Sequence, residues 1–345
     1  MKNTKKLTAA ILCAGLLAGC SSNGAAADNG AAADNGSTDR QYTIGLAQLV
    51  DHTSLNTIRD AIIDEFAEQG YKDGDNITID YQNAANQISN LDTIMSSYAS
   101  EGADAIIAIA TPTAQAAQNY SQDIPVIFSA VSDPVSAGLV VSMEEPGGNV
   151  TGTSDEVQVD QICDLMLELT PDVKTVGVLY NAGEANSVSN IKRFKEYAES
   201  KGLTVVEKTG TDLTTMQQAA TVLCQDADAI FSPNDNTVAS GMAALSQIAL
   251  DAGVPYYVGA DSMVQDGGFA TCGINYEELG RETARMTLEI LEGKKAGELP
   301  VKVFKDNLSV YINQKALDAL EQNSKTPVDF NDELKNSEGT IIIEQ

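Results

Sequence analysis

Short apolar runs alternate with longer amphipathic segments from residue 41 onward. The runs predict eleven strands, at residues 42–48, 77–82, 105–110, 125–130, 150–154, 175–180, 204–207, 229–232, 256–259, 269–273 and 308–312. The segments between most of them carry apolar residues at helical spacing. Continuous apolar strands that alternate with amphipathic helices are typical of parallel sheets covered on both faces.

Three segments show the helical spacing clearly. In the first, one predicted face carries Leu55, Ile58, Ile62 and Phe66. The polar residues Arg59, Asp60 and Glu65 fall elsewhere around that helix. The same arrangement recurs over residues 188–198 and 279–290, so each segment is expected to lay an apolar face on a sheet.

The predicted strands fall into two sets of similar length, at about 42–154 and 175–273. Each set consists of repeated strand–helix units. We therefore expect an α/β protein with two doubly wound parallel-sheet lobes. A single (β/α)₈ barrel is the alternative, and the number of strands and the Pro-Gly-Gly-Asn interruption at 146–149 weigh against it.

The charge of the chain changes the list of expected partners. It carries 49 acidic against 21 basic residues in 345, a net charge of −28, and loss of three lysines near its start would make it about −31. A field of that sign repels phosphate backbones and anionic lipid surfaces. Neither nucleic-acid binding nor docking on a membrane surface is expected.

The first twenty residues have the pattern of an export signal. Three lysines precede an apolar stretch at residues 7–17, which is too short to span a bilayer. The stretch ends in Leu-Ala-Gly-Cys at 17–20, which resembles a bacterial lipobox and implies cleavage before Cys20 and lipid attachment to its sulfur. The alternative is an ordinary secretory leader with an incidental cysteine. Residues 21–40 contain a repeated Ala-Ala-Ala-Asp-Asn-Gly unit, at 25–30 and 31–36, that predicts a flexible tether.

Three cysteines remain after the leader and Cys20. Cys163, Cys224 and Cys272 are widely spaced, which indicates neither a metal site nor a full disulfide framework. We expect Cys163 and Cys224, which lie in apolar helix-like segments, to be small buried hydrophobic residues, although one disulfide among the three stays open.

Polar residues follow the predicted strands where a ligand would bind. In open parallel sheets, ligands bind beyond the carboxyl ends of the strands, near helix N-termini. The candidate residues at these ends are Gln48, Asp51, Thr111, Pro112, Thr113, Ala114, Ser129, Ala130, Val131, Asp133, Asn181, Glu184, Asn186, Ser187, Asn234, Asp235 and Asp261. The Asn, Asp, Ser and Thr side chains among them also cap helices, which is the alternative role of each of these.

The chemistry of these ends favours a zwitterion. Helix N-termini with hydroxyl groups suit a carboxylate, and the acidic candidates Asp51, Glu184, Asp235 and Asp261 suit an ammonium group. If two lobes face each other by these ends, an amino acid matches both requirements.

Several motifs together resemble one known family. They are IGLAQLVDH at 44–52, ATPTAQA at 110–116, FSAVSDP at 128–134, GGNVTG at 147–152, VLYN at 178–181, EANS at 184–187 and GINYEELG at 273–280. With the lipobox, they resemble the tryptophan/tyrosine-type substrate-binding lipoproteins of ABC transporters over residues 41–321. The resemblance implies a type I periplasmic-binding fold that closes around a small amino acid-like ligand and delivers it to a permease and its ATPase.

The resemblance also implies boundaries. The signal peptide would be 1–20, the tether 21–40, the N-terminal lobe 41–153 with 276–300, the C-terminal lobe 154–275 with 301–330, and a tail 331–345. The chain would cross between lobes near Thr153, Asn275 and Val301. The ligand backbone would contact residues 111–114, 129–133 and 184–187, with Asp261 facing the same cleft and His52 and Tyr180 as candidates for stacking on its side chain. A lipid-anchored, extracytoplasmic monomer is expected.

Other functions remain as alternatives. His52 is the only histidine, and the chain has no Gly-x-Ser-x-Gly elbow, P-loop or dinucleotide-binding loop, so we expect no catalysis, cofactor or metal. An exported aspartate-based enzyme is one alternative. The same fold binding a nucleoside or sugar, or serving as a sensor for a membrane receptor, is another.

Overall fold

The computed structural model describes residues 41–305 and 308–344, all within one compact unit of the chain, Asp39–Gln345. The predicted signal peptide, the lipidated Cys20 and the tether lie outside these residues. Among the residues described, no helix combines the length and apolar character needed to cross a bilayer.

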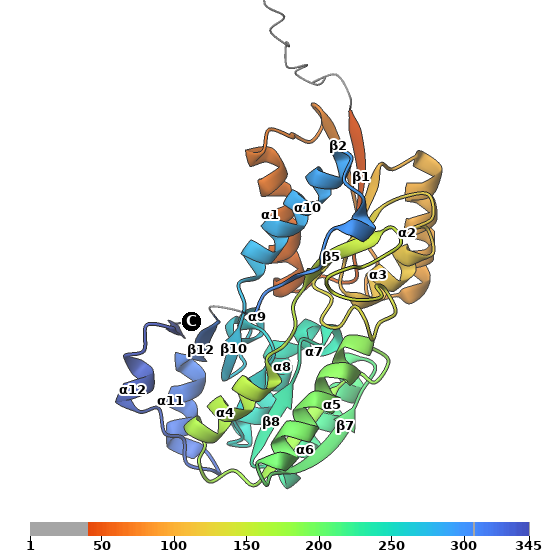
Figure 1. The fold of residues 1–345 in the computed structure, drawn as a ribbon. Helices are drawn as coiled ribbons and strands as arrows, with labels where there is room; N and C mark the ends of the chain where they lie inside the picture. The colour runs from red at the N-terminus through yellow and green to blue at the C-terminus, as the bar shows by residue number, and fades with distance from the viewer. Residues whose placement is uncertain (1–40, 306–307, 345) are drawn as a thin grey trace, which may run out of the picture. The chain divides into compact units, whose positions relative to one another are not determined.

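The N-terminal lobe is built on a six-stranded, all-parallel sheet ordered β11-β5-β4-β3-β1-β2. Its strands are β1 (Tyr42–Gln48), β2 (Ile77–Asn83), β3 (Ala105–Ile109), β4 (Val126–Ser129), β5 (Val150–Ser154) and β11 (Lys302–Val303). Its helices are α1 (Thr53–Glu68), α2 (Ile88–Glu101), α3 (Thr111–Gln118) and α10 (Tyr276–Leu291), with a 3₁₀ turn at Ala296–Glu298. Helices α1 and α10 lie side by side, and α2 and α3 lie on the other side of the sheet (Figure 1).

The C-terminal lobe is built on a seven-stranded sheet ordered β13-β12-β10-β9-β8-β6-β7, in which β12 runs antiparallel to β10. Its strands are β6 (Thr175–Tyr180), β7 (Thr204–Thr209), β8 (Ala229–Ser232), β9 (Tyr256–Val258), β10 (Ala270–Gly273), β12 (Ser309–Asn313) and β13 (Thr340–Ile343). Its helices are α4 (Val159–Leu169), α5 (Ala185–Ser200), α6 (Leu213–Asp226), α7 (Asn236–Ser240), α8 (Met242–Asp251), α9 (Asp261–Gln265), α11 (Gln314–Asn323) and α12 (Asp332–Lys335).

Two separate sheets confirm the doubly wound two-lobe prediction and exclude the barrel. All eleven predicted strands are present, with ends within two residues of the prediction. Two short strands were missed. The predicted tail contains α12 and β13, and β13 pairs with β12, so this segment belongs to the C-terminal lobe. Because β11 pairs with β5, the third crossing follows Val303 rather than Val301.

One residue on the predicted polar face of α1 is buried. The Glu65 side chain is only 2% exposed and accepts hydrogen bonds from Arg281 and Arg285 of α10. Burial raises the pKa of this carboxyl, but hydrogen bonds from Arg285, Gln69 and Arg281 outweigh burial and lower it to about 2. The two arginines on α10 are the reason that a buried acidic residue is tolerated at position 65. The spacing of residues within α1 alone could not predict these partners.

The three cysteines of the folded part are buried and free. The structure thus corrects the open alternative of a disulfide among Cys163, Cys224 and Cys272. Burial raises the pKa of the Cys163 and Cys272 thiols to about 11, as expected for unreactive buried residues.

Candidate functional site

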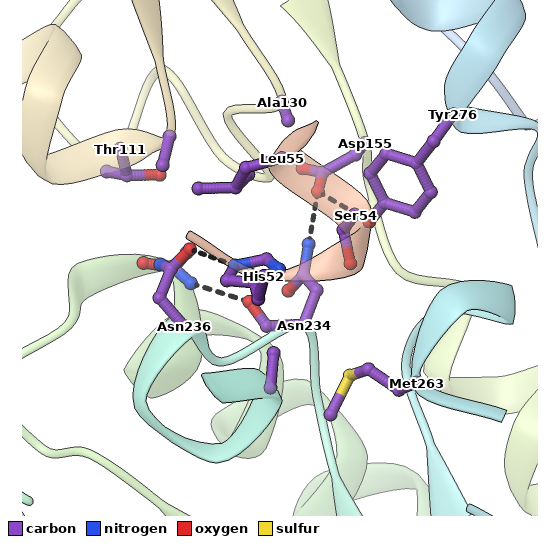
Figure 2. Close-up of a pocket in the computed structure, with 13 residues that line it drawn as sticks. His52, Ser54, Leu55, Thr111, Ala130, Asp155, Asn234, Asn236, Met263 and Tyr276 are labelled. Carbon is purple, nitrogen blue, oxygen red and sulfur yellow. Dashed lines mark hydrogen bonds between the residues drawn. The ribbon is translucent and has the colours of Figure 1, made fainter. Parts of the chain in front are cut away.

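A cavity lies where the carboxyl ends of the parallel strands of both lobes approach each other (Figure 2). It contains about 330 Å³ of space not filled by protein atoms, part of it open to solvent. Its lining residues are His52, Ser54, Leu55, Ala110, Thr111, Ala130, Asp155, Asn186, Asn234, Asn236, Ala239, Met263 and Tyr276. Both lobes contribute, so a molecule in the cavity would touch both.

Two alanines that line the cavity have unusual backbone conformations. Ala110 directly follows β3 and has φ of 80°, and Ala130 directly follows β4 and has φ of 56°. Positive φ is uncommon for residues other than glycine and costs free energy, so it persists only where the surroundings enforce it. The N–H of Ala110 is held by the carbonyl of Ser129, which ties the two strand ends together. Strain of this kind concentrates at ligand sites.

The start of α3 carries two buried hydroxyl groups that lack partners. Thr111 is 2% exposed and Thr113 is 0% exposed, and neither Oγ1 atom has a hydrogen-bond partner among the described residues. Buried polar groups are nearly always hydrogen-bonded, and Thr111 lines the cavity, so its orphan hydroxyl group indicates a missing polar partner there. Since the first N–H groups of a helix also attract anions, this end of the cavity suits a carboxylate.

A buried carboxylate lies on another side of the cavity. Asp155 follows β5 and accepts hydrogen bonds from Asn234 and Tyr276 (Figure 2). It also accepts a hydrogen bond from Ser132. Burial raises its pKa to about 6, although these hydrogen bonds act in the opposite direction. Within residues 41–305 and 308–344, no lysine or arginine pairs with it. The cavity therefore offers a negative charge that lacks a cation, which suits an ammonium group.

A histidine and an asparagine meet across the lobes at the same cavity. The Nε2 atom of His52 lies 3.3 Å from Oδ1 of Asn236, the first residue of α7. The carboxylate of Glu184 holds that asparagine, because it accepts from its N–H and its Nδ2 atom and also from the N–H and Oγ1 of Thr237. Burial lowers the pKa of His52 to about 4 despite this contact and the nearby Asp51.

Further hydrogen bonds join the lobes around the cavity. Oγ1 of Thr53 donates to Oδ1 of Asp266 at 2.9 Å, and Oγ of Ser189 donates to Oδ2 of Asp133 at 2.7 Å. The hydroxyl group of Ser54 lies against that of Ser262. These contacts would break if the lobes separated, so they stabilise the arrangement seen here.

The structure brings four of the seventeen predicted residues to the cavity: Thr111, Ala130, Asn186 and Asn234. The others lie elsewhere or behind it. Hydrogen bonds link the segments that carry Asn181, Glu184, Ser187 and Asp235. The carboxylate of Asp235 accepts hydrogen bonds from the N–H groups of Asn181 and Val238 and from the hydroxyl group of Ser187. Burial and the neighbouring Glu184 raise the pKa of Asp235.

The remaining candidates are also accounted for. Ser129 bonds to Thr283 inside the N-terminal lobe, and Gln48 donates to the carbonyl of Val50. Pro112, Thr113, Ala114 and Val131 belong to the strand ends and the first turn of α3 but do not line the cavity. The lobe-joining Asp133 is likewise outside the lining.

Three residues with predicted roles lie outside the cavity lining. Asp51 is exposed, and it lies 4.0 Å from Arg59, with which it forms an ion pair. The Asp261 carboxylate bonds to the N–H of Ser262 at the start of α9 and does not line the cavity. Tyr180 donates to Glu207 on the neighbouring strand and also lies outside the lining, so of the two stacking candidates only His52 is at the cavity.

The sequence interpretation missed Asp155 and Tyr276, which both adjoin the crossings between lobes. The predicted crossings near Thr153 and Asn275 were the available signal, since residues at a hinge lie beside the cleft that the hinge closes. Also missed were Ser54, Leu55, Ala110, Asn236, Ala239 and Met263, most of which are one to three residues from a predicted site residue.

Glu184 gives a prediction about stability. Replacing Glu184 with alanine removes the acceptor of four hydrogen bonds at the start of α7 and is expected to lower the free energy of unfolding by about 2–3 kcal/mol. Urea unfolding measures the change. As a control, Glu298→Ala removes a carboxylate that is 69% exposed and should cost less than about 1 kcal/mol. Equal losses in both variants would contradict the capping role.

The fold agrees with comparisons to known proteins. The family model for ABC transporter substrate binding proteins matches residues 43–331. A curated relative, the tyrosine-binding protein of Clostridioides difficile strain R20291, is 40% identical over 315 residues, which is 91% of each protein.

Solved structures show the same relationship. A domain from Streptococcus pneumonia in complex with L-Trp is 36% identical, covers 88% of this chain and 100% of its own, and has a TM-score of 0.83. The ligand-free, open structure of a substrate binding protein with adhesive properties from Clostridium difficile is 39% identical, covers 88% and 99%, and has a TM-score of 0.66. Because the identities are similar, the better superposition indicates a lobe arrangement closer to that of the tryptophan complex. The chain belongs to the family of ABC transporter substrate-binding proteins.

Proposed function

We propose that the protein binds an aromatic L-amino acid in the cavity between its lobes and delivers it to an ABC permease. The observation that carries the proposal is the buried Asp155 carboxylate, which lacks a cation and lines the same cavity as the start of α3. A relative named for tyrosine and a solved relative in complex with L-Trp support the aromatic side chain.

The two charged groups of the ligand have separate places. The α-ammonium group would pair with Asp155 and with the Oδ1 atom of Asn186, a buried acceptor that lacks a partner among the described residues. The α-carboxylate would accept hydrogen bonds from the first turn of α3, where the Thr111 hydroxyl group is unpaired. Such a division of donors and acceptors favours a zwitterion over a neutral sugar or nucleoside.

The ligand's side chain has an apolar neighbourhood. Leu55, Ala239 and Met263 line the cavity from α1, α7 and α9, so each lobe supplies part of the surface. Burial of an aromatic ring against such side chains is favourable in proportion to its apolar area.

Ligand binding would act as a population shift. Groups from the N-terminal lobe, such as Thr111, and from the C-terminal lobe, such as Asn186, would bind the same molecule only when the lobes are together. A ligand with better contacts in that arrangement shifts the equilibrium toward it. The permease and its ATPase would then recognise the liganded form.

Members of the family act outside the cytoplasm, and no helix in the described part of this chain could span a membrane. We further propose that cleavage before Cys20 and lipid attachment anchor the mature protein, and that residues 21–40 tether the lobes. A tethered monomer is the simplest carrier. Labelling with a radioactive fatty acid in wild type, lost in Cys20→Ser, would test the anchor.

Acidification should weaken binding. The pKa of Asp155 is raised to about 6 in the empty cavity, and the ammonium group needs the ionised form. Ligand affinity should therefore fall roughly tenfold per pH unit below about pH 6. The raised pKa of Asp155 affects folding stability in the opposite direction from ligand affinity. Because the pKa of Asp155 is higher in the folded than in the unfolded protein, the stability that this group contributes is present at low pH and is lost as the pH rises through about 6.

The pH dependence is measured by calorimetric titration across this range. Other buried carboxyl groups, such as Asp261, also have a raised pKa, so the control is Asp155→Asn measured alongside. The variant should bind weakly with little pH dependence. If its residual affinity falls with acidity as steeply as in wild type, the titrating group is not Asp155.

A thermal-shift screen tests the proposed ligand class. The protein is unfolded and refolded to remove carried-over ligand and is then heated with amino acids, nucleosides and sugars. Tyrosine or tryptophan should raise the unfolding temperature at micromolar concentration, because a ligand that binds only the native state stabilises it. A response to nucleosides or sugars alone would overturn the proposal.

A further inference from the structure

The only histidine of the chain has an unpaired ring nitrogen at the cavity. Nδ1 of His52 is buried and has no hydrogen-bond partner among the described residues, although His52 lines the cavity. Figure 2 shows the ring within the cavity lining, bonded on its other side to Asn236. A buried nitrogen without a partner costs free energy, which a ligand could recover.

The hydrogen bonds behind the ring decide which nitrogen carries the proton. The carboxylate of Glu184 accepts a hydrogen bond from Nδ2 of Asn236 at 2.6 Å, and the other groups that bond to this carboxylate are also donors. Because Nδ2 is the donor half of the amide, the Oδ1 half faces His52, and Oδ1 can only accept. Nε2 of His52, 3.3 Å away, must therefore carry the hydrogen.

A neutral imidazole protonated at Nε2 has a lone pair at Nδ1. The lowered pKa of His52, about 4, is consistent with a ring that stays neutral near neutral pH. Nδ1 is then an acceptor only, and its missing partner must be a hydrogen-bond donor.

The position of this acceptor connects it to the ligand's side chain rather than to its charged groups. Leu55 lies in the first turn of α1, which begins directly after His52, and Ala239 follows Asn236 by three residues, so that second pair lies on one face of α7. All four residues line the cavity. The His52–Asn236 pair thus borders the apolar part of the lining, whereas the negative charge belongs to Asp155.

We propose that Nδ1 of His52 accepts a hydrogen bond from a donor on the ligand's aromatic ring, so that the site selects tyrosine and tryptophan over phenylalanine. This inference rests on the proposed function. The phenol O–H and the indole N–H both supply the required donor, and a benzyl ring supplies none. A site built around such a bond discriminates strongly against an analogue that lacks the donor, because its own polar atom is left unpaired.

Ligand pairs of matched shape test the inference. Tyrosine is compared with para-fluoro-L-phenylalanine, and tryptophan with benzothienyl-L-alanine, in which sulfur replaces the N–H group. The protein contains no tryptophan, so indole fluorescence of bound tryptophan reports binding directly, and the other ligands are measured by competition. In wild type, the member without a donor should bind at least about tenfold more weakly.

The variant His52→Leu should bring both ratios close to one. Since this variant also loses the bond to Asn236, a second measurement uses the wild-type protein. Nitrogen-15 NMR of the single histidine should show Nε2 protonated and Nδ1 unprotonated, and the Nδ1 signal should shift with tyrosine but much less with para-fluorophenylalanine.

The outcomes separate the inference from the function on which it rests. Equal affinities within each ligand pair in wild type, or a proton on Nδ1 in the free protein, would overturn the role of His52 and leave amino-acid binding intact. Failure of every aromatic amino acid to bind would overturn both.

Discussion

Replacing Asp155 with asparagine is expected to weaken binding of the amino acid about 100-fold or more. The substitution keeps the size of the side chain and removes the negative charge that pairs with the ligand's ammonium group. Loss of one partner of a buried ion pair costs about 3–5 kcal/mol, and 1.4 kcal/mol corresponds to a tenfold change in affinity. Calorimetric titration of both proteins measures the effect.

Asp261→Asn is the matched control for this prediction. Asp261 is another buried carboxyl with a pKa raised by burial to about 6, but it does not line the cavity. Its replacement should change affinity by less than about threefold, the level of a substitution outside a site. If Asp261→Asn weakens binding and Asp155→Asn does not, the ammonium group is bound at the start of α9 instead.

Replacing Gly152 with alanine is expected to lower the free energy of unfolding by at least about 3 kcal/mol. Gly152 lies in β5 opposite Phe128 of β4, and a Cβ atom placed on it would lie 2.0 Å from the backbone oxygen of Phe128. A backbone atom in a central strand cannot move aside without breaking the sheet. Urea unfolding of the two proteins gives the difference, unless the variant fails to fold at all, which would agree with the prediction.

Gly148→Ala is the control. Gly148 has a positive φ of 62°, as Gly152 has one of 155°, but no atom lies within 4 Å of a Cβ atom added at Gly148. Backbone strain alone should cost about 1 kcal/mol there. A Gly152→Ala protein as stable as the Gly148→Ala protein would show that β4 and β5 are less closely packed than the structure indicates.

Most strands were predictable because each is a short run rich in apolar residues between turns, and burial of the inner strands on both faces leaves a direct trace in composition. The exceptions have physical reasons. Lys302–Val303 is too short to form a pattern, and Thr340–Ile343 lies beyond a polar segment that resembles a tail. Its place at the sheet edge is set by pairing with β12, which the local sequence does not encode.

The strand ends predicted the region in which the cavity lies, but the roles of the acidic residues there were not predictable. Glu184 and Asp235 follow strands as expected, yet their oxygens accept from the N–H groups of α7 and its neighbours. Capping and ligand binding use the same side chains, and only the three-dimensional contacts separate them. Asp155 was missed because it follows a strand that leads into a crossing between lobes rather than into a helix.

The most direct test of the account is a calorimetric titration of the refolded protein with L-tyrosine and, separately, with D-tyrosine. The account places ammonium and carboxylate groups on different residues, Asp155 and the start of α3, so it predicts saturable binding of one L-tyrosine per protein at micromolar or lower concentration and much weaker binding of the D form. Absence of saturable binding by L-tyrosine and by L-tryptophan, together with saturable binding of a nucleoside or a sugar, would contradict it.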